Sequence, residues 1–125
     1  MPGLVLVIDD EPLVRWSLGE RLRQAGYEVR EAGSAVQART LFEGAANRPL
    51  VVLLDLRLPD VEGLALFEEL RRQHPACQVI ILSAHATPEL ALTALAGGAL
   101  HVGNKPFDLE EIVALVRRGF ATERC

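Results

Sequence analysis

Five short apolar segments recur along the chain, and each is followed by polar or turn-forming residues. They span residues 4–8, 27–32, 50–54, 78–82 and 100–104. Segments this short with little polar interruption are typical of strands buried on both faces, as in a parallel sheet. Glu28 and Arg30 interrupt the second segment, which predicts that this strand lies nearer an edge of the sheet.

Apolar residues recur at helical spacing after each of these segments, and capping residues and turns mark where the helices begin and end. Pro12 suits the first turn of the first helix, with Asp10 or Glu11 as its cap, and Gly26 ends that helix. The remaining boundaries are marked by Ser34, by Thr87 followed by Pro88, by Asp108, and by Pro75 at the end of the third helix.

The alternation of five strands with five helices predicts a single domain of the α/β class over residues 1–125. The expected architecture is a five-stranded parallel sheet wound on both faces, a flavodoxin-like (βα)5 fold with strand order 2-1-3-4-5. No repeated motif, linker or low-complexity segment divides the chain. With 125 residues, half of them apolar, the chain is long enough to bury a core.

Four of the five predicted strands end in residues with useful chemistry. Asp9 and Asp10 follow the first strand, Asp55 the third, Ser83 the fourth and Lys105 the fifth. The carboxyl ends of parallel strands lie at one edge of the sheet, and the first and third strands are neighbours in the expected order, so the three carboxylates should meet. Each residue alone is explained as well by a cap, a turn or a surface position, and only their joint placement indicates a site.

Three carboxylates at close range repel one another, and a divalent cation removes that repulsion. Mg²⁺ suits a site made of carboxylates, waters and a phosphate group. Lys105 would add a positive charge, and Ser83 a hydroxyl that donates to an anionic oxygen. A carboxylate nucleophile with these neighbours favours phosphoryl transfer onto Asp55, a reaction that needs no general base.

Charge and composition exclude several other classes of function. The net charge is −4 and no basic run occurs, so this domain is not expected to bind nucleic acid directly. The first apolar segment has no basic residues ahead of it, and no segment approaches the about 18 apolar residues of a membrane span. Cys77 and Cys125 have no metal-binding spacing, which favours a reducing compartment. We therefore expect a cytoplasmic protein without membrane contact.

With these residues placed, the chain resembles the receiver domain of bacterial two-component response regulators over essentially its whole length. The matching motifs are Leu-Val-Ile-Asp-Asp-Glu at 6–11, Asp-Leu-Arg-Leu-Pro at 55–59 with Gly63, Ile-Leu-Ser-Ala at 81–84 and Lys-Pro-Phe at 105–107. Residues 14–18, 26–29 and 105–110 further resemble receivers of the nitrogen-regulatory class, which activate transcription. The resemblance implies a signalling switch, not a turnover enzyme, whose own chemistry is Mg²⁺-dependent self-phosphorylation and self-dephosphorylation.

The resemblance also implies a role for each residue of the site. Asp55 is the expected phosphoacceptor, and the expected donor is a phosphohistidine of a sensor histidine kinase or a phosphotransfer protein. The bond between Lys105 and Pro106 is expected to be cis. The implied Mg²⁺ ligands are Asp9, Asp10, Asp55 and the backbone carbonyl of Arg57, and the implied phosphoryl-binding residues are Ser83, Ala84 and Lys105.

The fifth strand departs from the family pattern. The Tyr or Phe that usually swings inward behind the hydroxyl residue is replaced by Val102, with His101 next to it. Arg57 and His85 each lie two residues beyond a site residue, where they are expected to tune the lifetime of the phosphoryl group. Solvated loop side chains are an equally good interpretation of these two residues.

The predicted fourth helix is apolar around most of its circumference, which core packing alone does not explain. Leu90, Leu92 and Leu95 lead us to expect a partner surface formed by this helix, the fifth strand and the last helix. Phosphorylation is expected to rearrange this surface, and a second copy of the chain is a possible partner.

Two other functions remain open. The missing aromatic at Val102 also fits an atypical receiver that serves as a constitutive protein-interaction module without a working phospho-switch. A hydrolase with Asp55 as nucleophile is disfavoured, because such enzymes generally need a second acid two residues on, where this chain has Arg57. Since the chain ends with the last helix, we expect either a stand-alone regulator or a receiver cut from a longer protein.

Overall fold

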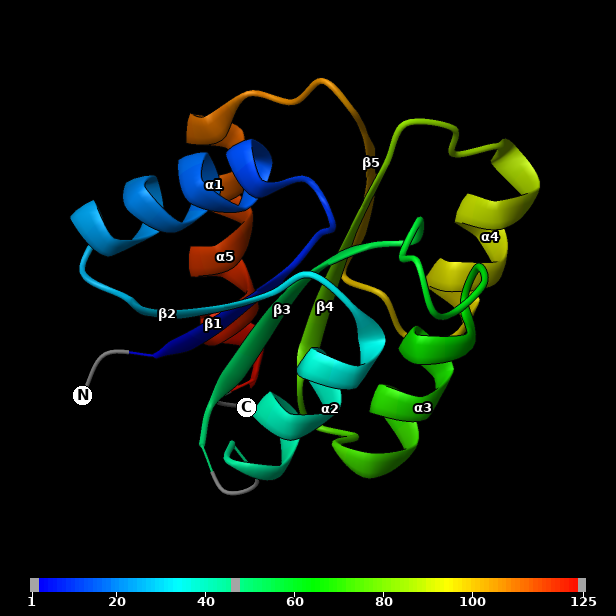
Figure 1. The fold of residues 1–125 in the computed structure, drawn as a ribbon, viewed down its shortest axis with the longest axis horizontal. Helices are drawn as coiled ribbons and strands as arrows, with labels where there is room; N and C mark the ends of the chain where they lie inside the picture. The colour runs from blue at the N-terminus through cyan, green and yellow to red at the C-terminus, as the bar shows by residue number, and fades with distance from the viewer. Residues whose placement is uncertain (1–2, 46–47, 124–125) are drawn as a thin grey trace.

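The computed structural model of the protein describes residues 3–45 and 48–123, and Cys125 therefore lies outside the described residues. Five strands form one parallel sheet in the order β2-β1-β3-β4-β5 (Figure 1). The strands are β1 (Leu4–Ile8), β2 (Glu28–Ala32), β3 (Leu50–Asp55), β4 (Gln78–Ser83) and β5 (His101–Asn104). The helices are α1 (Pro12–Gln24), α2 (Ala35–Glu43), α3 (Ala65–Gln73), α4 (Pro88–Ala96) and α5 (Leu109–Glu123). The predicted architecture and strand order are confirmed, and no strand boundary differs from its predicted position by more than one residue.

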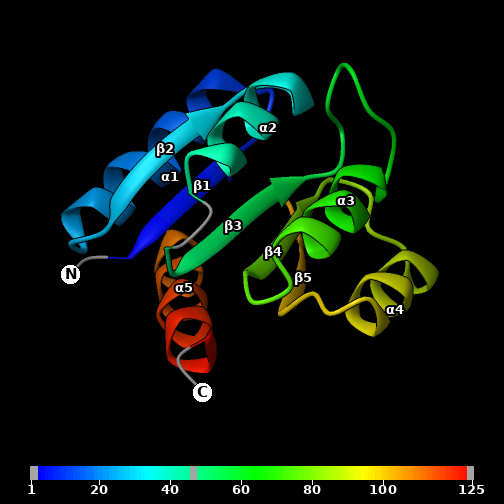
Figure 2. The ribbon, with the colours of Figure 1, turned by 90° about the horizontal axis from the view of Figure 1, so that it is seen from below.

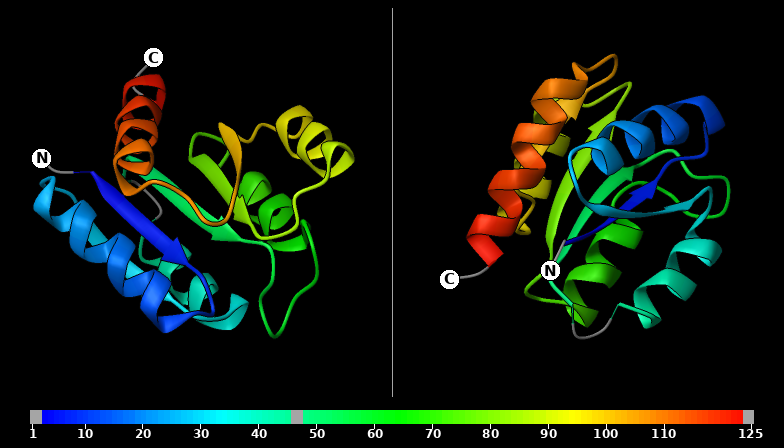
Figure 3. Two further views of the ribbon diagram at one scale, coloured as in Figure 1. Left: turned by 90° about the horizontal axis from the view of Figure 1, so that it is seen from above. Right: turned by 90° about the vertical axis from the view of Figure 1, so that its left-hand side faces the viewer.

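Helices cover both faces of the sheet. Helices α1 and α5 lie on one face, and α2, α3 and α4 lie on the other (Figures 1 and 3). Neighbouring residues of a strand point to opposite faces, so Leu53 packs with α1 and α5 while Leu54 packs with the other three helices. Because both faces are covered, every residue of β1 and β3 is buried, and these strands read as continuous apolar segments.

The two edges of the sheet are β2 and β5. The edge position predicted for the second strand is confirmed, and its polar residues Glu28, Arg30 and Glu31 are half-buried. No residue of β5 is fully buried. The carboxyl ends of β1, β3 and β4 therefore form the middle of one rim, where side chains can be buried and still lie near solvent.

The caps of two helices are as predicted, and at α1 the predicted cap position is confirmed but its side chain makes no capping hydrogen bond. The Ser34 and Thr87 hydroxyls accept hydrogen bonds from the Gln37 and Leu90 N–H groups, each at 3.2 Å. Glu11 occupies the cap position of α1, yet its side chain makes no capping hydrogen bond. Its carboxylate accepts a hydrogen bond from Lys105 instead, because a bond to an ammonium group is stronger than one to a backbone N–H.

The peptide bond between Lys105 and Pro106 is cis, as expected. Among the described residues, no helix is both long and apolar enough to cross a membrane.

Candidate functional site

The buried polar side chains gather at one place. Among the described residues, the buried polar or charged ones are Asp9, Asp55 and Ser83, each no more than 4% exposed. They lie at the carboxyl ends of β1, β3 and β4, as the strand order predicted. Burying a carboxylate costs free energy unless a partner compensates it, so two buried carboxylates at one rim indicate a functional site.

Lys105 supplies that partner. Its Nζ lies 2.7 Å from Asp9 Oδ2, 2.9 Å from Glu11 Oε1 and 3.3 Å from Asp55 Oδ2. Its backbone N–H donates to the Ser83 carbonyl oxygen at 2.9 Å, which fixes the start of the side chain beside β4. Lys105 is the only lysine in the sequence, and a single ammonium group here contacts three carboxylates.

Burial and charge act in opposite directions on these groups. Burial raises the pKa of the Asp55 carboxyl; the hydrogen bond from the Arg57 N–H opposes this rise, and the charge of Asp9 adds to it. Burial acts to lower the pKa of Lys105, but hydrogen bonds to Asp9 and Glu11 and the nearby carboxylate charges outweigh it, and the pKa rises. The site therefore combines a permanent cation with a carboxylate whose ionised form is destabilised by its surroundings.

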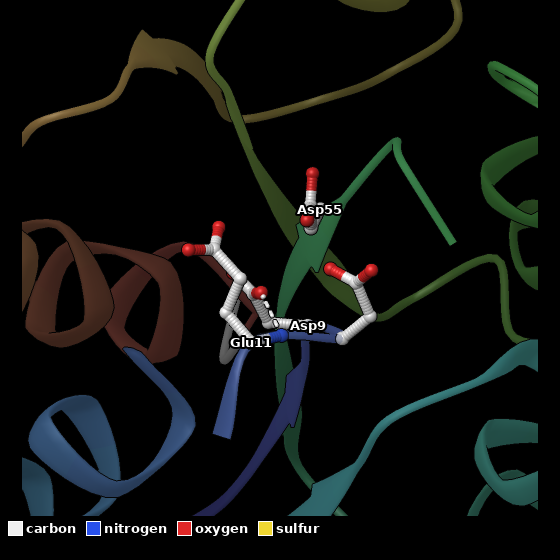
Figure 4. A group of neighbouring side chains, drawn as sticks. Asp9, Glu11 and Asp55 are labelled. Atoms are coloured by element: carbon white, nitrogen blue, oxygen red, sulfur yellow. Dashed lines mark hydrogen bonds between the residues drawn. The ribbon is translucent and has the colours of Figure 1, made fainter. Parts of the chain in front are cut away.

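The same carboxylates could hold a metal ion. Single oxygens of Asp9, Asp10, Glu11 and Asp55 all lie within 4.8 Å of one another. Figure 4 shows Asp9 and Glu11 at the end of β1 with their carboxylates near Asp55 at the tip of β3. All-oxygen donors, two of them on exposed residues, suit Mg²⁺, which keeps several of its waters. The residues present therefore fit the predicted ion.

The backbone of Arg57 and the side chain of Glu11 also belong to the site. The Arg57 N–H donates to Asp55 Oδ1 at 3.1 Å, so its backbone lies directly beside the phosphoacceptor predicted from the sequence. Glu11 was expected only as a helix cap, so its place in the site was not predicted. Its position as the third consecutive acid after β1 was the signal that could have revealed it.

An open hollow of about 320 Å³ lies over Asp55. At about 30 Å³ per water molecule, it has room for about ten waters, and hence for a phosphoryl group and a hydrated ion. It is lined by Asp10, Glu11, Asp55, Arg57, Ala84 and Lys105. Most of the predicted metal and phosphoryl-binding residues thus border one space that opens to solvent.

Ser83 and His85 are the sequence neighbours of Ala84, which lines this hollow. The Ser83 hydroxyl oxygen accepts a hydrogen bond from the His85 N–H at 3.2 Å. The hydroxyl hydrogen can still be donated to another acceptor. The side chains of Arg57 and His85 are both exposed, so both can reach solvent near the hollow.

The two candidate switch residues of β5 lie on opposite faces of the sheet. Val102 packs against the core formed with α2, α3 and α4. A side chain added at Gly103 would meet Leu82 of the other core at 3.3 Å and the His101 ring at 3.4 Å. His101 therefore lies on the α5 face, away from Val102.

The three leucines predicted to form a surface on α4 do not share one environment. Leu92 is 69% exposed and Leu95 is 47% exposed, whereas Leu90 is half-buried and packs against the core. Ala94 is the only fully buried residue of this nine-residue helix. The exposed apolar surface of α4 is therefore centred on Leu92 and Leu95.

A second, more apolar groove adjoins the hollow. It has a volume of about 570 Å³ and shares Glu11, Ala84 and Lys105 with the site. Its apolar walls come from the start of α1, where Leu13 is 80% exposed, and from the segment that connects β5 to α5.

Comparison with known proteins identifies the class that this fold and site define. Residues 5–117 match the response regulator receiver domain family, and the chain belongs to that family. Among its relatives is the DNA-binding transcriptional regulator NtrC of Salmonella typhimurium, which is 39% identical over 121 residues. That match covers 95% of this chain but only 25% of NtrC, so the chain spans about a quarter of the length of this relative.

Solved structures agree with this assignment. The receiver domain of NtrX from Brucella abortus superposes with a TM-score of 0.85 at 33% identity, covering 94% of this chain and 98% of that one. The beryllofluoride-activated NtrC4 receiver domain dimer gives a TM-score of 0.88 at 28% identity, covering 96% and 98% of the two chains. The resemblance to receivers of the nitrogen-regulatory class is thus confirmed.

Proposed function

We propose that this domain is a phosphorylation-controlled signalling switch that accepts a phosphoryl group on Asp55 in the presence of Mg²⁺. The observation that supports this most strongly is the placement of Asp55. It is a buried carboxylate at the end of the central strand, within hydrogen-bonding distance of Lys105, under a hollow that opens to solvent.

The reaction follows from these groups. A carboxylate oxygen of Asp55 attacks the phosphorus of a phosphohistidine, the new O–P bond forms, and the N–P bond of the donor breaks with its electron pair remaining on the imidazole. Lys105 stabilises charge on the transferred oxygens, and the Ser83 hydroxyl donates to one of them. Bound by Asp9, Asp10, Asp55 and the Arg57 carbonyl, Mg²⁺ would neutralise part of that charge.

The donor would be a sensor histidine kinase or a phosphotransfer protein. Its histidine must approach Asp55 through the open hollow, and the adjoining groove beside Leu13 offers apolar contact area at that point. The relatives of the NtrC kind are DNA-binding regulators, and we propose that the protein in which this domain acts likewise controls transcription.

Phosphoryl uptake tests the proposal directly. We expect the domain incubated with acetyl phosphate and Mg²⁺ to gain one phosphoryl group by intact mass, and peptide mapping to place it on Asp55. Excess EDTA should suppress the gain, because the acidic cluster then lacks the cation that offsets its charge. Absence of uptake with Mg²⁺ would refute the switch, and continuous release of phosphate would favour a hydrolase.

The packing of Val102 supports one alternative. A half-buried valine packed against the core cannot swing between buried and exposed positions as a large aromatic ring does. The domain would then be a constitutive interaction module. Uptake on Asp55 without any change in oligomeric state or partner binding would favour this alternative.

Arg57 and His85 are proposed to set the lifetime of the phosphoryl group. Both have side chains that reach solvent beside the hollow, where they can contact the phosphoryl oxygens or the attacking water. We expect Arg57→Ala combined with His85→Ala to change the dephosphorylation rate about threefold or more, measured by loss of the phosphorylated species after removal of donor. An unchanged rate would show that the two are ordinary solvated side chains.

We propose that phosphorylation promotes association through α4, β5 and α5. Leu92 and Leu95 are exposed leucines on a mostly apolar helix, and a dimer has been solved for an activated receiver of a related protein. Sedimentation should show a dimer with beryllofluoride, and Leu92→Ser with Leu95→Ser should keep the protein monomeric. Leu13→Ser, which changes a still more exposed leucine on α1, is the control. A wild-type domain that stays monomeric both with and without beryllofluoride would contradict this proposal.

A further inference from the structure

Asp60 lies in the loop between β3 and α3 but makes its hydrogen bonds with a different element. Its Oδ1 accepts from the Ala35 N–H at 2.8 Å, and its Oδ2 accepts from the Val36 N–H at 3.0 Å. These are the first two residues of α2, 25 and 24 positions away in the sequence. The bonds from Ala35 and Val36 lower the pKa of Asp60, so it is ionised at neutral pH.

The start of a helix suits such a carboxylate. Its first N–H groups have no partners within the helix and carry partial positive charge. In α2 the Gln37 N–H is bound by the Ser34 hydroxyl, and the two preceding N–H groups are bound by Asp60. The cap is therefore shared between a local residue, Ser34, and a residue of a distant loop.

The loop that carries Asp60 begins at the site. It projects beyond the carboxyl end of β3, next to the start of α2 (Figures 2 and 3). Leu58 is buried in the core and pairs with Val61, which closes the loop into a tight turn with Asp60 inside it. Arg57 lies between this turn and Asp55, and donates its N–H to the Asp55 carboxylate.

A second contact joins α2 to α3, the helix that follows the loop. The Arg39 guanidinium of α2 donates two hydrogen bonds to the Glu69 carboxylate of α3, at 2.8 and 3.1 Å. The loop is thus tied to α2 at Asp60, and the helix that follows it is tied to α2 at Glu69. Without Asp60, the segment between the core residue Leu58 and the start of α3 would lose the two hydrogen bonds that tie it to α2.

We propose that Asp60 is a positioning residue of the phosphorylation site. By binding the start of α2 it holds the β3–α3 loop in place, so that the Arg57 N–H stays on Asp55 and the Arg57 carbonyl faces the cation. The part of this inference that concerns the cation rests on the proposed function. Asp60 itself touches neither the metal site nor the phosphoryl group; it acts through Arg57.

Asp60→Ala and Ser34→Ala form a matched pair for the test. Each removes a side-chain cap from the start of α2, but only Asp60 belongs to the loop. Two quantities are measured by NMR: the hydrogen-exchange rate of the Arg57 amide, and the Mg²⁺ dissociation constant from a titration with the metal alone. Thermal unfolding of both variants reports the general loss of stability.

Asp60→Ala should speed exchange of the Arg57 amide and weaken Mg²⁺ binding, each about fivefold or more, whereas Ser34→Ala should change neither beyond its effect on stability. Asp60→Asn keeps one acceptor oxygen, so its exchange rate and Mg²⁺ dissociation constant should lie between those of the wild type and Asp60→Ala. If Asp60→Ala and Ser34→Ala affect the Arg57 amide equally, Asp60 is only a helix cap and the inference is wrong. A wild-type domain that takes up no phosphoryl group would contradict the proposed function, while the Arg57 exchange rates would still decide on the anchoring by Asp60.

Discussion

Replacing Asp55 with Asn is expected to abolish phosphoryl uptake and, in the absence of Mg²⁺, to make the domain more stable. Uptake is lost because an amide oxygen is a poor nucleophile towards phosphorus, and no other buried carboxylate lies at the tip of β3. Stability rises because the substitution removes a buried negative charge that lies beside Asp9. The two effects have opposite signs, which a general disturbance of the fold would not produce.

The gain in stability should depend on pH. The pKa of Asp55 is raised in the folded protein, so the folded state holds this proton more tightly than the unfolded chain does. The contribution of Asp55 to stability therefore falls as the pH rises from its ordinary pKa of 3.8 through the raised folded value. The advantage of Asp55→Asn should thus be small at the acid end of this interval and complete at neutral pH.

Thermal unfolding in EDTA measures this difference. Allowing for solvent screening, we expect a gain of about 1 kcal/mol at neutral pH, or about 3–5 °C in the unfolding midpoint. Glu62→Gln, at an exposed position of the neighbouring loop, is the control for removing a negative charge and should have little effect. With Mg²⁺ the difference should shrink, because the cation stabilises only the chain with the full set of carboxylates. An Asn variant that is less stable at neutral pH would contradict the argument.

Removing the ammonium group should have the converse effect. Lys105→Ala leaves Asp9, Glu11 and Asp55 without the cation that they share, so the domain should be less stable in EDTA and should recover part of the loss in Mg²⁺. Phosphoryl uptake should slow by about 10²-fold, the usual cost of removing one donor that stabilises a transition state. It should not vanish, because the nucleophile is intact.

Lys105→Arg is not expected to rescue this variant. The Lys105 side chain is only 12% exposed, and a planar guanidinium group cannot make the same three contacts as a compact ammonium group in that space. The stability cost of Lys105→Ala should also be smaller when Asp55 is already Asn, because one of the three repelling charges is gone. Equal costs in the two backgrounds would show that Lys105 and Asp55 do not interact.

The sequence predicted the fold because apolar segments typical of buried strands alternate with segments of helical spacing along the whole chain. Strands buried on both faces appear in the sequence as apolar segments. Five such strands alternating with helices predict a parallel sheet covered by helices on both faces. The strand order then brought Asp9, Asp55 and Ser83 to one rim, although they are far apart in the chain. Local pattern and topology sufficed for these residues.

The residues that were missed, Glu11 and Asp60, make contacts with distant parts of the chain. Glu11 was expected only as a cap, because acids before a helix usually are caps, and nothing near it in the sequence shows that Lys105 lies within reach. Asp60 follows a proline in a turn, and its bonds to α2 arise only in the folded chain, where the loop lies next to the start of that helix (Figure 2). The placement of His101 could have been predicted, since neighbouring strand residues alternate between faces.

The charge distribution of the chain has a practical consequence. Lys105 is the only lysine among the 13 lysine and arginine residues, so isotope labelling with lysine alone puts one amino-acid reporter into the domain, and that reporter lies in the site. Its ammonium group contacts three carboxylates, and under the proposed function it should contact phosphoryl oxygens once Asp55 is phosphorylated, which should shift its resonance. A spectrum with a single lysine signal would therefore count the two states of the switch directly, without assignment of any other residue.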